Sequence, residues 1–192
     1  MALAKFTTDG ILDAAAEEVR NHGSAVRIAS IAARVGAPTG SIYHRFGSRE
    51  ELLVHLWLRS VRRFHEVYLA AGRSEDPEKA LLGMAESVVT FTRDHPQDAA
   101  SMALFRQKRL VENTPDSCRE AVAHINDEIH ERLSELAQLR YGRVTEKRRQ
   151  LVRIAAADGP YGFVRPYLWD TVPEWLPAVV VASSTAVLAL GD

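Results

Sequence analysis

The residues most able to do chemistry in this sequence lie between Val19 and Arg49, a stretch with five arginines and no aspartate or glutamate. The formal net charge of the whole chain is -1, so this positive charge is a local concentration and not a property of the composition. Guanidinium groups donate to phosphate oxygens, and a basic segment is therefore typical of a surface that binds nucleic acid. The alternative is a solvated basic face on an ordinary helical bundle, and composition alone does not decide between them. The arginines are Arg20, Arg27, Arg34, Arg45 and Arg49.

Two short helices are expected to position these residues. Apolar residues at 28, 31, 32 and 35 follow the helical period, and Gly36 ends that helix. A second short helix is expected from Pro38 or Thr39 to Phe46, with Ile42 and Phe46 facing inward. A glycine turn between two short helices is the spacing of a helix-turn-helix, whose second helix lies in the major groove of DNA. Its exposed face would carry short hydroxyls and hydrogen-bond donors, namely Thr39, Ser41, Tyr43, His44 and Arg45.

The residues of this region resemble a known family. The runs Ile31-Ala32-Ala33-Arg34-Val35-Gly36, Gly40-Ser41-Ile42-Tyr43-His44-Arg45-Phe46 and Ser48-Arg49-Glu50-Glu51-Leu52-Leu53 are similar to the signature of the tetracycline-repressor (TetR) family. The sequence resemblance covers roughly the first 55 residues, and beyond them only the number and order of expected helices agree. Members of this family are usually homodimeric repressors that leave an operator when a small molecule enters their second domain.

The resemblance implies a domain division and a set of DNA contacts. We expect a helix-turn-helix domain at residues 1–47 and a ligand-binding and dimerisation domain at residues 48–192. Pro38 stands where the family often has a capping serine, so the alternative for Thr39 is that it caps the helix instead of contacting a base. The residues expected to contact DNA are Arg27, Thr39, Gly40, Ser41, Tyr43, His44, Arg45 and Arg49, with Arg49 gripping phosphate at the start of the next helix.

Helical periodicity continues through the rest of the chain, and no convincing strand is found. Thr7 or Thr8, Ser48 with Glu51, Asp76-Pro77 and Thr145 are typical helix starts. Gly159-Pro160 is expected to kink or break a helix. The expected fold is therefore all-α, with about nine helices.

The second domain is less informative about its ligand. An apolar cavity lined by flexible methionine and aromatic side chains is one interpretation, and plain core packing is the alternative for each residue. The candidate lining residues are Met84, Phe91, Met102, Phe105, Ile125 and Ile129. The histidines at 95, 124 and 130 do not form a convincing metal motif, so we predict no metal site and no cofactor. Cys118, near an expected helix start, is a candidate for a lowered thiol pKa, with an ordinary packed or exposed thiol as the alternative.

The last helix favours a homodimer. Its apolar surface is too broad for the final helix of a monomer, and with the helix around residues 151–154 it resembles the four-helix dimer interface of the family. Burial against its own domain is the alternative. The expected interface residues are Leu151, Ile154, Leu176, Val179, Val180, Val187 and Leu190.

Several classes of protein are disfavoured by what the sequence lacks. No glycine-rich nucleotide loop, nucleophile elbow, Cys-x-x-Cys or zinc-protease motif occurs, so an enzyme is not expected. One cysteine, no signal-peptide pattern and no apolar run of roughly 20 residues favour a cytoplasmic protein without a membrane partner. We expect a DNA-binding regulator, in particular a repressor released from a palindromic operator by a small-molecule effector. The alternative is a helical small-molecule-binding protein or enzyme that does not bind an operator.

Overall fold

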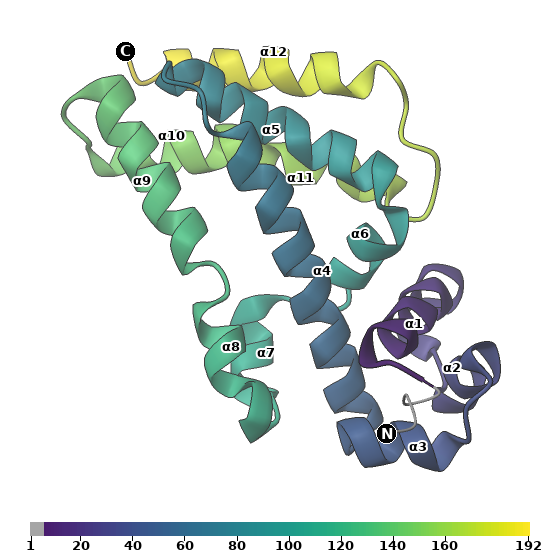
Figure 1. Cartoon of the computed structure of the whole chain (residues 1–192). Coiled ribbons are helices and arrows are strands. Elements are labelled where there is room, and N and C mark those ends of the chain that lie inside the picture. The colour runs from purple at the N-terminus through teal and green to yellow at the C-terminus, as the bar shows by residue number, and fades with distance from the viewer. Residues whose placement is uncertain (1–5) are drawn as a thin grey trace. The chain divides into compact units, whose positions relative to one another are not determined.

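The computed structural model describes residues 6–192, which are helical almost throughout and contain no β-strand (Figure 1). The all-α expectation is therefore confirmed. Twelve α-helical segments are present in the described residues, because several expected helices are divided into shorter pieces. They are α1 (Thr8–His22), α2 (Ile28–Val35), α3 (Thr39–Phe46), α4 (Arg49–Ala71), α5 (Pro77–Asp94), α6 (Pro96–Met102), α7 (Gln107–Asn113), α8 (Arg119–His124), α9 (Asp127–Tyr141), α10 (Glu146–Arg153), α11 (Gly159–Val164) and α12 (Leu176–Ala189).

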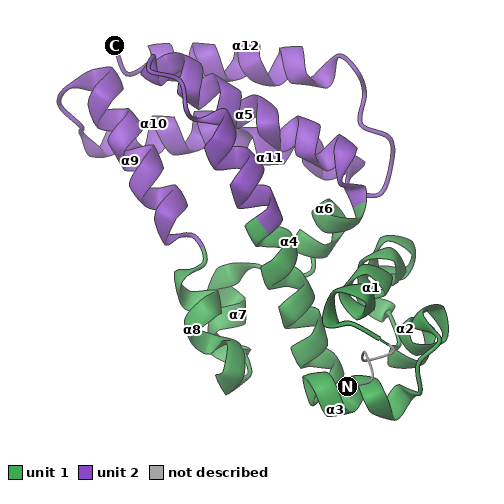
Figure 2. Cartoon of the chain, in the orientation of Figure 1, with its two compact units in different colours: residues 1–62, 97–125 green, residues 63–96, 126–192 purple. Residues whose placement is uncertain are grey.

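The chain forms two compact units, and α4 runs through both of them (Figure 2). Unit 1 holds residues 1–62 and 97–125, and unit 2 holds residues 63–96 and 126–192. Unit 1 therefore includes residues 48–62 together with the first three helices, whereas the functional domain boundary is expected after residue 47. The reason is that Leu52, Leu53 and Leu56 of α4 complete the apolar core that α1, α2 and α3 share.

Local signals explain where the helices of unit 1 begin. The Thr7 hydroxyl accepts from the Gly10 amide at 3.0 Å, which caps α1. The Ser48 hydroxyl accepts from the Glu51 amide at 3.0 Å and caps α4 in the same way. A second core in unit 1 joins α4 to the segment that contains α7 and α8. The Trp57 indole N–H also donates to the Met102 carbonyl at 3.2 Å.

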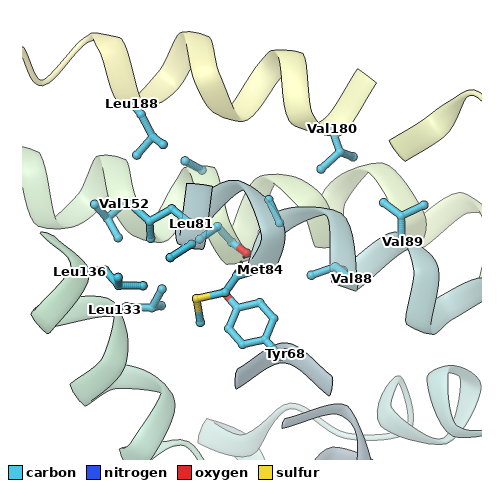
Figure 3. Packing of buried hydrophobic residues seen from close by; sticks show 14 of the residues in the cluster. Tyr68, Leu81, Met84, Val88, Val89, Leu133, Leu136, Val152, Val180 and Leu188 are labelled. Carbon is cyan, nitrogen blue, oxygen red and sulfur yellow. Dashed lines mark hydrogen bonds between the residues drawn. The ribbon is translucent and has the colours of Figure 1, made fainter. Parts of the chain in front are cut away.

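Unit 2 has its own core, formed by the end of α4 with α5, α9, α10, α11 and α12. Tyr68, Leu81 and Met84 lie at its centre, with Leu136 and Leu188 contributed from later helices (Figure 3). All five side chains are almost completely buried. This packing leaves one face of α12 inside the unit and its opposite face exposed.

The break predicted at Gly159-Pro160 is a π-helical segment, Ile154–Asp158, between α10 and α11. The Gly159 amide donates to the Ile154 carbonyl, which leaves the Ala155 carbonyl without its usual helical donor, and Pro160 has no N–H to offer Ala156. The Ser184 hydroxyl donates to the Ala155 carbonyl at 2.7 Å, and the Tyr68 hydroxyl donates to the Ala156 carbonyl at 2.8 Å. Two buried side chains therefore satisfy the carbonyls that the helix distortion releases.

Candidate nucleic-acid interface

The α2-turn-α3 segment has the geometry of a helix-turn-helix. Ile28, Ile31 and Ala32 bury one face of α2 in the unit 1 core. Gly36 follows α2 with φ 66° and ψ 30°, and its amide donates to the carbonyls of Ala32 and Ala33. A left-handed conformation of this kind strains any residue with a Cβ, so glycine ends α2 and lets the chain turn into α3.

Helix α3 buries two residues and exposes the others. Ile42 and Phe46 are 1% and 3% exposed, and they anchor α3 to the core. The side chains expected at a DNA surface are all exposed: Thr39, Ser41, Tyr43, His44 and Arg45, together with Gly40. Tyr43 keeps 46% of its surface accessible, so packing against the first helix does not bury it.

The start of α3 carries no side-chain cap. Pro38 occupies the N-cap position, and Thr39 is the first helical residue and does not act as a cap. Gly40 lies in the first turn, and a Cβ built on it would meet nothing within 4 Å. Within residues 6–192 nothing therefore requires glycine at residue 40, whereas close approach of another molecule would.

The arginines of the basic stretch have different roles in the structure. Arg34 forms ion pairs with Glu17 and Glu18, and its hydrogen bond with Glu18 raises the pKa of the guanidinium further. Arg45 donates to the Phe6 carbonyl at 2.9 Å while its side chain stays exposed. Arg27 is exposed at the N-cap position of α2. The local positive charge is thus smaller than the sequence alone indicates.

Arg49 ties the start of α4 to the segment before α2. Its Nε donates to the Val26 carbonyl at 2.8 Å, its Nη2 donates to the Ser24 carbonyl, and its Nη1 lies 3.3 Å from a Glu50 carboxylate oxygen. Most of the guanidinium donors therefore have partners within the protein. The side chain predicted to grip phosphate also fixes the position of α4 beside the helix-turn-helix.

The six residues predicted to line an apolar cavity divide between the two units. Met84, Phe91 and Ile129 are buried in unit 2, where Met84 belongs to the packed centre in Figure 3. The other three, Met102, Phe105 and Ile125, are partly exposed in unit 1. The six therefore belong to different compact units, and helical periodicity identifies inward positions without telling a cavity from a core.

A pocket of about 580 Å³ does lie within unit 1, and of the six residues predicted to line a cavity Phe105 lines this one. Its wall is mixed in character, with apolar residues such as Leu53, Leu104 and Leu110 beside charged ones. The charged lining residues are Arg49, Arg106, Arg109 and Glu50. Arg106 and Arg109 were not predicted, since they lie on a short helix start that carries no recognisable motif.

The predicted dimer residues also divide. Leu151, Leu176 and Val180 are buried inside their own unit, so they are core residues and their side chains cannot reach a second copy. Val187 is partly buried. The exposed members are Ile154, Val179 and Leu190, at 40%, 37% and 62%.

Two of these exposed residues, Val179 and Leu190, belong to one face of α12 and its end. The face repeats every three or four residues and contains no charge, and we call it the α12 face: Ala178, Val179, Ala182, Thr185, Ala186, Ala189 and Leu190. Because α12 is apolar on both sides, sequence periodicity could not tell its buried face from its exposed one.

One group of chemically active side chains was missed by sequence reasoning. Glu51 and His55 on α4 meet Cys118, 63 residues beyond His55, and their ligand atoms lie within 4.8 Å of one another. Burial raises the pKa of the Cys118 thiol, which is opposite to the lowering considered from its place near a helix start. No local pattern links these residues, because the fold alone brings the short helical turn Asp116–Cys118 against α4.

Within residues 6–192, no helix combines the length and the apolar character needed to cross a lipid bilayer.

Comparison with known proteins supports the family resemblance. Residues 11–56 match the sequence model of the family described as "Bacterial regulatory proteins, tetR family". The match covers most of α1, all of α2 and α3, and the beginning of α4. Among curated protein sequences, the chain has no significant match.

Solved structures of transcriptional regulators, several of them described as TetR-family proteins, share the fold of nearly the whole chain. PfmR of Thermus thermophilus superposes with a TM-score of 0.73 at 20% identity, covering 93% of this chain and 97% of its own. The ketosteroid regulator KstR2 of Mycobacterium tuberculosis gives a TM-score of 0.70 at 19% identity, with coverages of 95% and 93%. A tetR-family regulatory protein of Rhodococcus RHA1 gives 0.73 at 15% identity, with 96% of each chain covered. The resemblance inferred from the motifs is therefore confirmed, and at these identities the structures establish the fold.

Proposed function

We propose that this chain, which has a TetR-family N-terminal domain and the fold of that family's regulators, is a DNA-binding transcriptional repressor. The observation that carries the proposal is the exposed face of α3. Six consecutive or neighbouring positions remain accessible there while Ile42 and Phe46 hold the helix in place. A rigid helix presenting hydroxyl, phenol, imidazole and guanidinium groups is suited to the major groove.

Specific roles follow from the chemistry of each side chain. Ser41, Tyr43 and His44 offer hydrogen bonds to base edges, with Thr39 beside the helix start. Arg27 and Arg45 are exposed cations suited to phosphate oxygens, which positions the protein without reading sequence. We assign DNA reading to residues 1–47, with α4 as the support behind them, and effector binding and dimerisation to residues 48–192.

Dimerisation would complete the operator site. A single helix-turn-helix reads few base pairs, and two copies related by a two-fold axis need half-sites in an inverted repeat. The α12 face is the surface we assign to the partner copy, because it is uncharged, continuous and exposed. Removing such a face from water is the ordinary driving force for a stable homodimer.

The effector is proposed to be a small anionic molecule with an apolar part. The pocket lined by Phe105 supports this assignment because its wall combines leucine side chains with three arginines, Arg49, Arg106 and Arg109, against one carboxylate, that of Glu50. A carboxylate or phosphate would face the guanidinium groups, and hydrocarbon would face the leucines. Arg49 also bonds to Val26 and Ser24, just before α2, so a ligand that drew its guanidinium away would loosen the support of the helix-turn-helix.

The sharpest test of DNA binding is Gly40→Ala. The added methyl group meets no atom of residues 6–192, and alanine favours helix over glycine, so the variant should fold at least as stably as the parent. If the first turn of α3 approaches DNA closely, the methyl group will weaken binding by about tenfold or more, since it holds the helix away from the bases.

The measurement is a binding titration on fragments selected from genomic DNA with the full-length protein. His44→Ala should also lose affinity, whereas the matched control His124→Ala, on α8, should not. Selection that yields no preferred fragment, or Gly40→Ala and His44→Ala variants that both keep full affinity, would contradict the proposal. Selected sites without an inverted repeat would contradict the dimeric arrangement alone.

A further inference from the structure

Glu51, His55 and Cys118 form a compact cluster inside unit 1, which we call the Cys118 cluster. The Cys118 sulfur lies 3.5 Å from Nε2 of His55, and the nearest carboxylate oxygen of Glu51 lies within 4.8 Å of both. We propose that these three residues bind a divalent transition-metal ion of the zinc class, with one coordination position left for water or a further ligand.

The spacing of the donor atoms fits a tetrahedral centre. With Zn–S near ~2.3 Å and Zn–N near ~2.0 Å, tetrahedral angles place sulfur and nitrogen roughly 3.5 Å apart. The observed separation of Sγ and Nε2 is that value. The carboxylate can complete a third corner through a small change of rotamer, because Glu51 is only partly buried.

The donor types are also those of such an ion. A thiolate, a neutral imidazole and a carboxylate together carry two negative charges, which balance a divalent cation. Thiolate and imidazole favour zinc over magnesium or calcium, which prefer oxygen ligands. A cluster of acidic side chains alone would not have this selectivity, and here two of the three donors are not acidic.

The fold holds these side chains in place from several directions. Glu51 and His55 are one turn apart on α4 and so share a face. The Ser117 hydroxyl donates to Glu51 Oε1 at 2.5 Å, and the ring of Phe46 packs edge-on against His55 with centroids 5.7 Å apart. Cys118 is 1% exposed, so its sulfur approaches from the apolar side of the site. Outer partners of this kind orient the ligands of known metal centres.

Gly47 explains how the carboxylate reaches the cluster. A Cβ at this position would lie 2.8 Å from Oε2 of Glu51, and the residue has φ 70°. Glycine therefore allows both the turn after α3 and the close approach of Glu51. Phe46 and Gly47 lie at the end of α3. An ion bound in the Cys118 cluster would therefore lie beside residues that hold the proposed recognition helix in place. This consequence rests on the proposed function, whereas the metal site itself does not.

Cobalt(II) is a suitable probe, because its absorption reports both tetrahedral geometry and bonding to thiolate. The full-length protein, first treated with a chelator, is titrated with Co²⁺ and then with Zn²⁺. We expect a single equivalent to produce tetrahedral d–d bands and a sulfur-to-cobalt charge-transfer band, and Zn²⁺ to remove both. No DNA is present, so the result does not depend on whether the protein binds an operator.

Variants decide which residues hold the ion. Cys118→Ser should abolish the charge-transfer band, and His55→Gln and Glu51→Gln should each weaken Co²⁺ binding by about tenfold or more. His124→Gln is the matched control and should leave the titration unchanged. The proposal is overturned if the parent protein gives no charge-transfer band, or if His55→Gln binds Co²⁺ as tightly as the parent. Circular dichroism of each variant identifies any that fails to fold, and the two variants on α4 then decide the outcome without Cys118→Ser.

Discussion

The guanidinium of Arg34 on α2 is held by the carboxylate of Glu18 on α1, with Nε 3.0 Å and Nη2 2.7 Å from the same oxygen, Oε1. The Glu18 side chain is only 7% exposed, so its charge is nearly removed from water and needs a partner. Arg34 supplies that partner from the middle of the basic stretch. One of the five arginines that indicated a nucleic-acid surface therefore stabilises the packing of the first two helices instead.

We predict that Glu18→Ala lowers the thermal midpoint of unfolding clearly more than Glu17→Ala does. Both variants remove a carboxylate that pairs with Arg34, but the Glu17 side chain is 50% exposed and its pair is screened by water. The loss of Glu18 also opens a gap beside the unit 1 core. Thermal denaturation followed by circular dichroism compares the two variants directly, and equal midpoints would show that the Glu18 pair is not structural.

The Tyr68 hydroxyl provides a second test of packing, in unit 2. Tyr68→Phe keeps the ring in the core but removes the hydroxyl that donates to the Ala156 carbonyl in the π-helical segment. An unsatisfied buried acceptor costs about 1–3 kcal/mol, and we expect the free energy of unfolding to fall by that amount. Urea denaturation measures the change. Tyr161→Phe is the control, because Tyr161 is 47% exposed and should give an unchanged midpoint.

Much of the N-terminal fold could be predicted, because its signals are local. Thr7 and Ser48 cap the helices they were expected to cap, and Gly36 ends α2 as expected. Each of these residues acts on a backbone only a few positions away. The exposed face of α3 followed from the same short period, with Ile42 and Phe46 turned inward.

The remaining features depend on contacts between distant residues, and no local pattern contains them. Glu51 was identified as part of a capping box, yet its carboxylate accepts from Ser117 instead, and only the folded chain brings Cys118 beside it. Arg106 and Arg109 form a pocket wall only because α7 returns to the beginning of α4. Val179 and Val180 are neighbours of the same residue type, and packing alone decides which of them is buried.

The lowered pKa of His65 makes the free energy of unfolding depend on pH. Partial burial lowers its pKa to about 4, with a hydrogen bond to Asn126 opposing the shift and the nearby His130 adding to it. In the unfolded chain the imidazole has its ordinary pKa near ~6.5, so the unfolded state binds this proton first as the pH falls. The contribution of His65 to the free energy of unfolding is therefore fully present above about pH 6.5. It is lost as the pH falls from about 6.5 to about 4, and the loss is at most about 3 kcal/mol.

His65→Gln removes this titration, so its unfolding free energy should change less than that of the parent between pH 7 and pH 4. Urea denaturation across this range measures both proteins. Parallel pH profiles for parent and variant would contradict the assignment to His65. His95→Gln serves as the control, because it removes an exposed imidazole from the C-terminal end of α5.

The last prediction distinguishes a proposed interface residue, Val179, from the core residue next to it in sequence, Val180. Val179 is 37% exposed on the α12 face, whereas Val180 is fully buried against its own unit. If the α12 face meets its copy across a two-fold axis, Val179→Arg places two positive charges in one desolvated contact, and we expect a folded monomer. Val180→Arg forces a charge into the unit 2 core, and we expect loss of the fold itself. Light scattering reports the mass and circular dichroism the helix content, so the two outcomes are distinguishable. A Val179→Arg protein that remains folded and dimeric would exclude the α12 face as the dimer contact, because a buried pair of like charges could not be tolerated there.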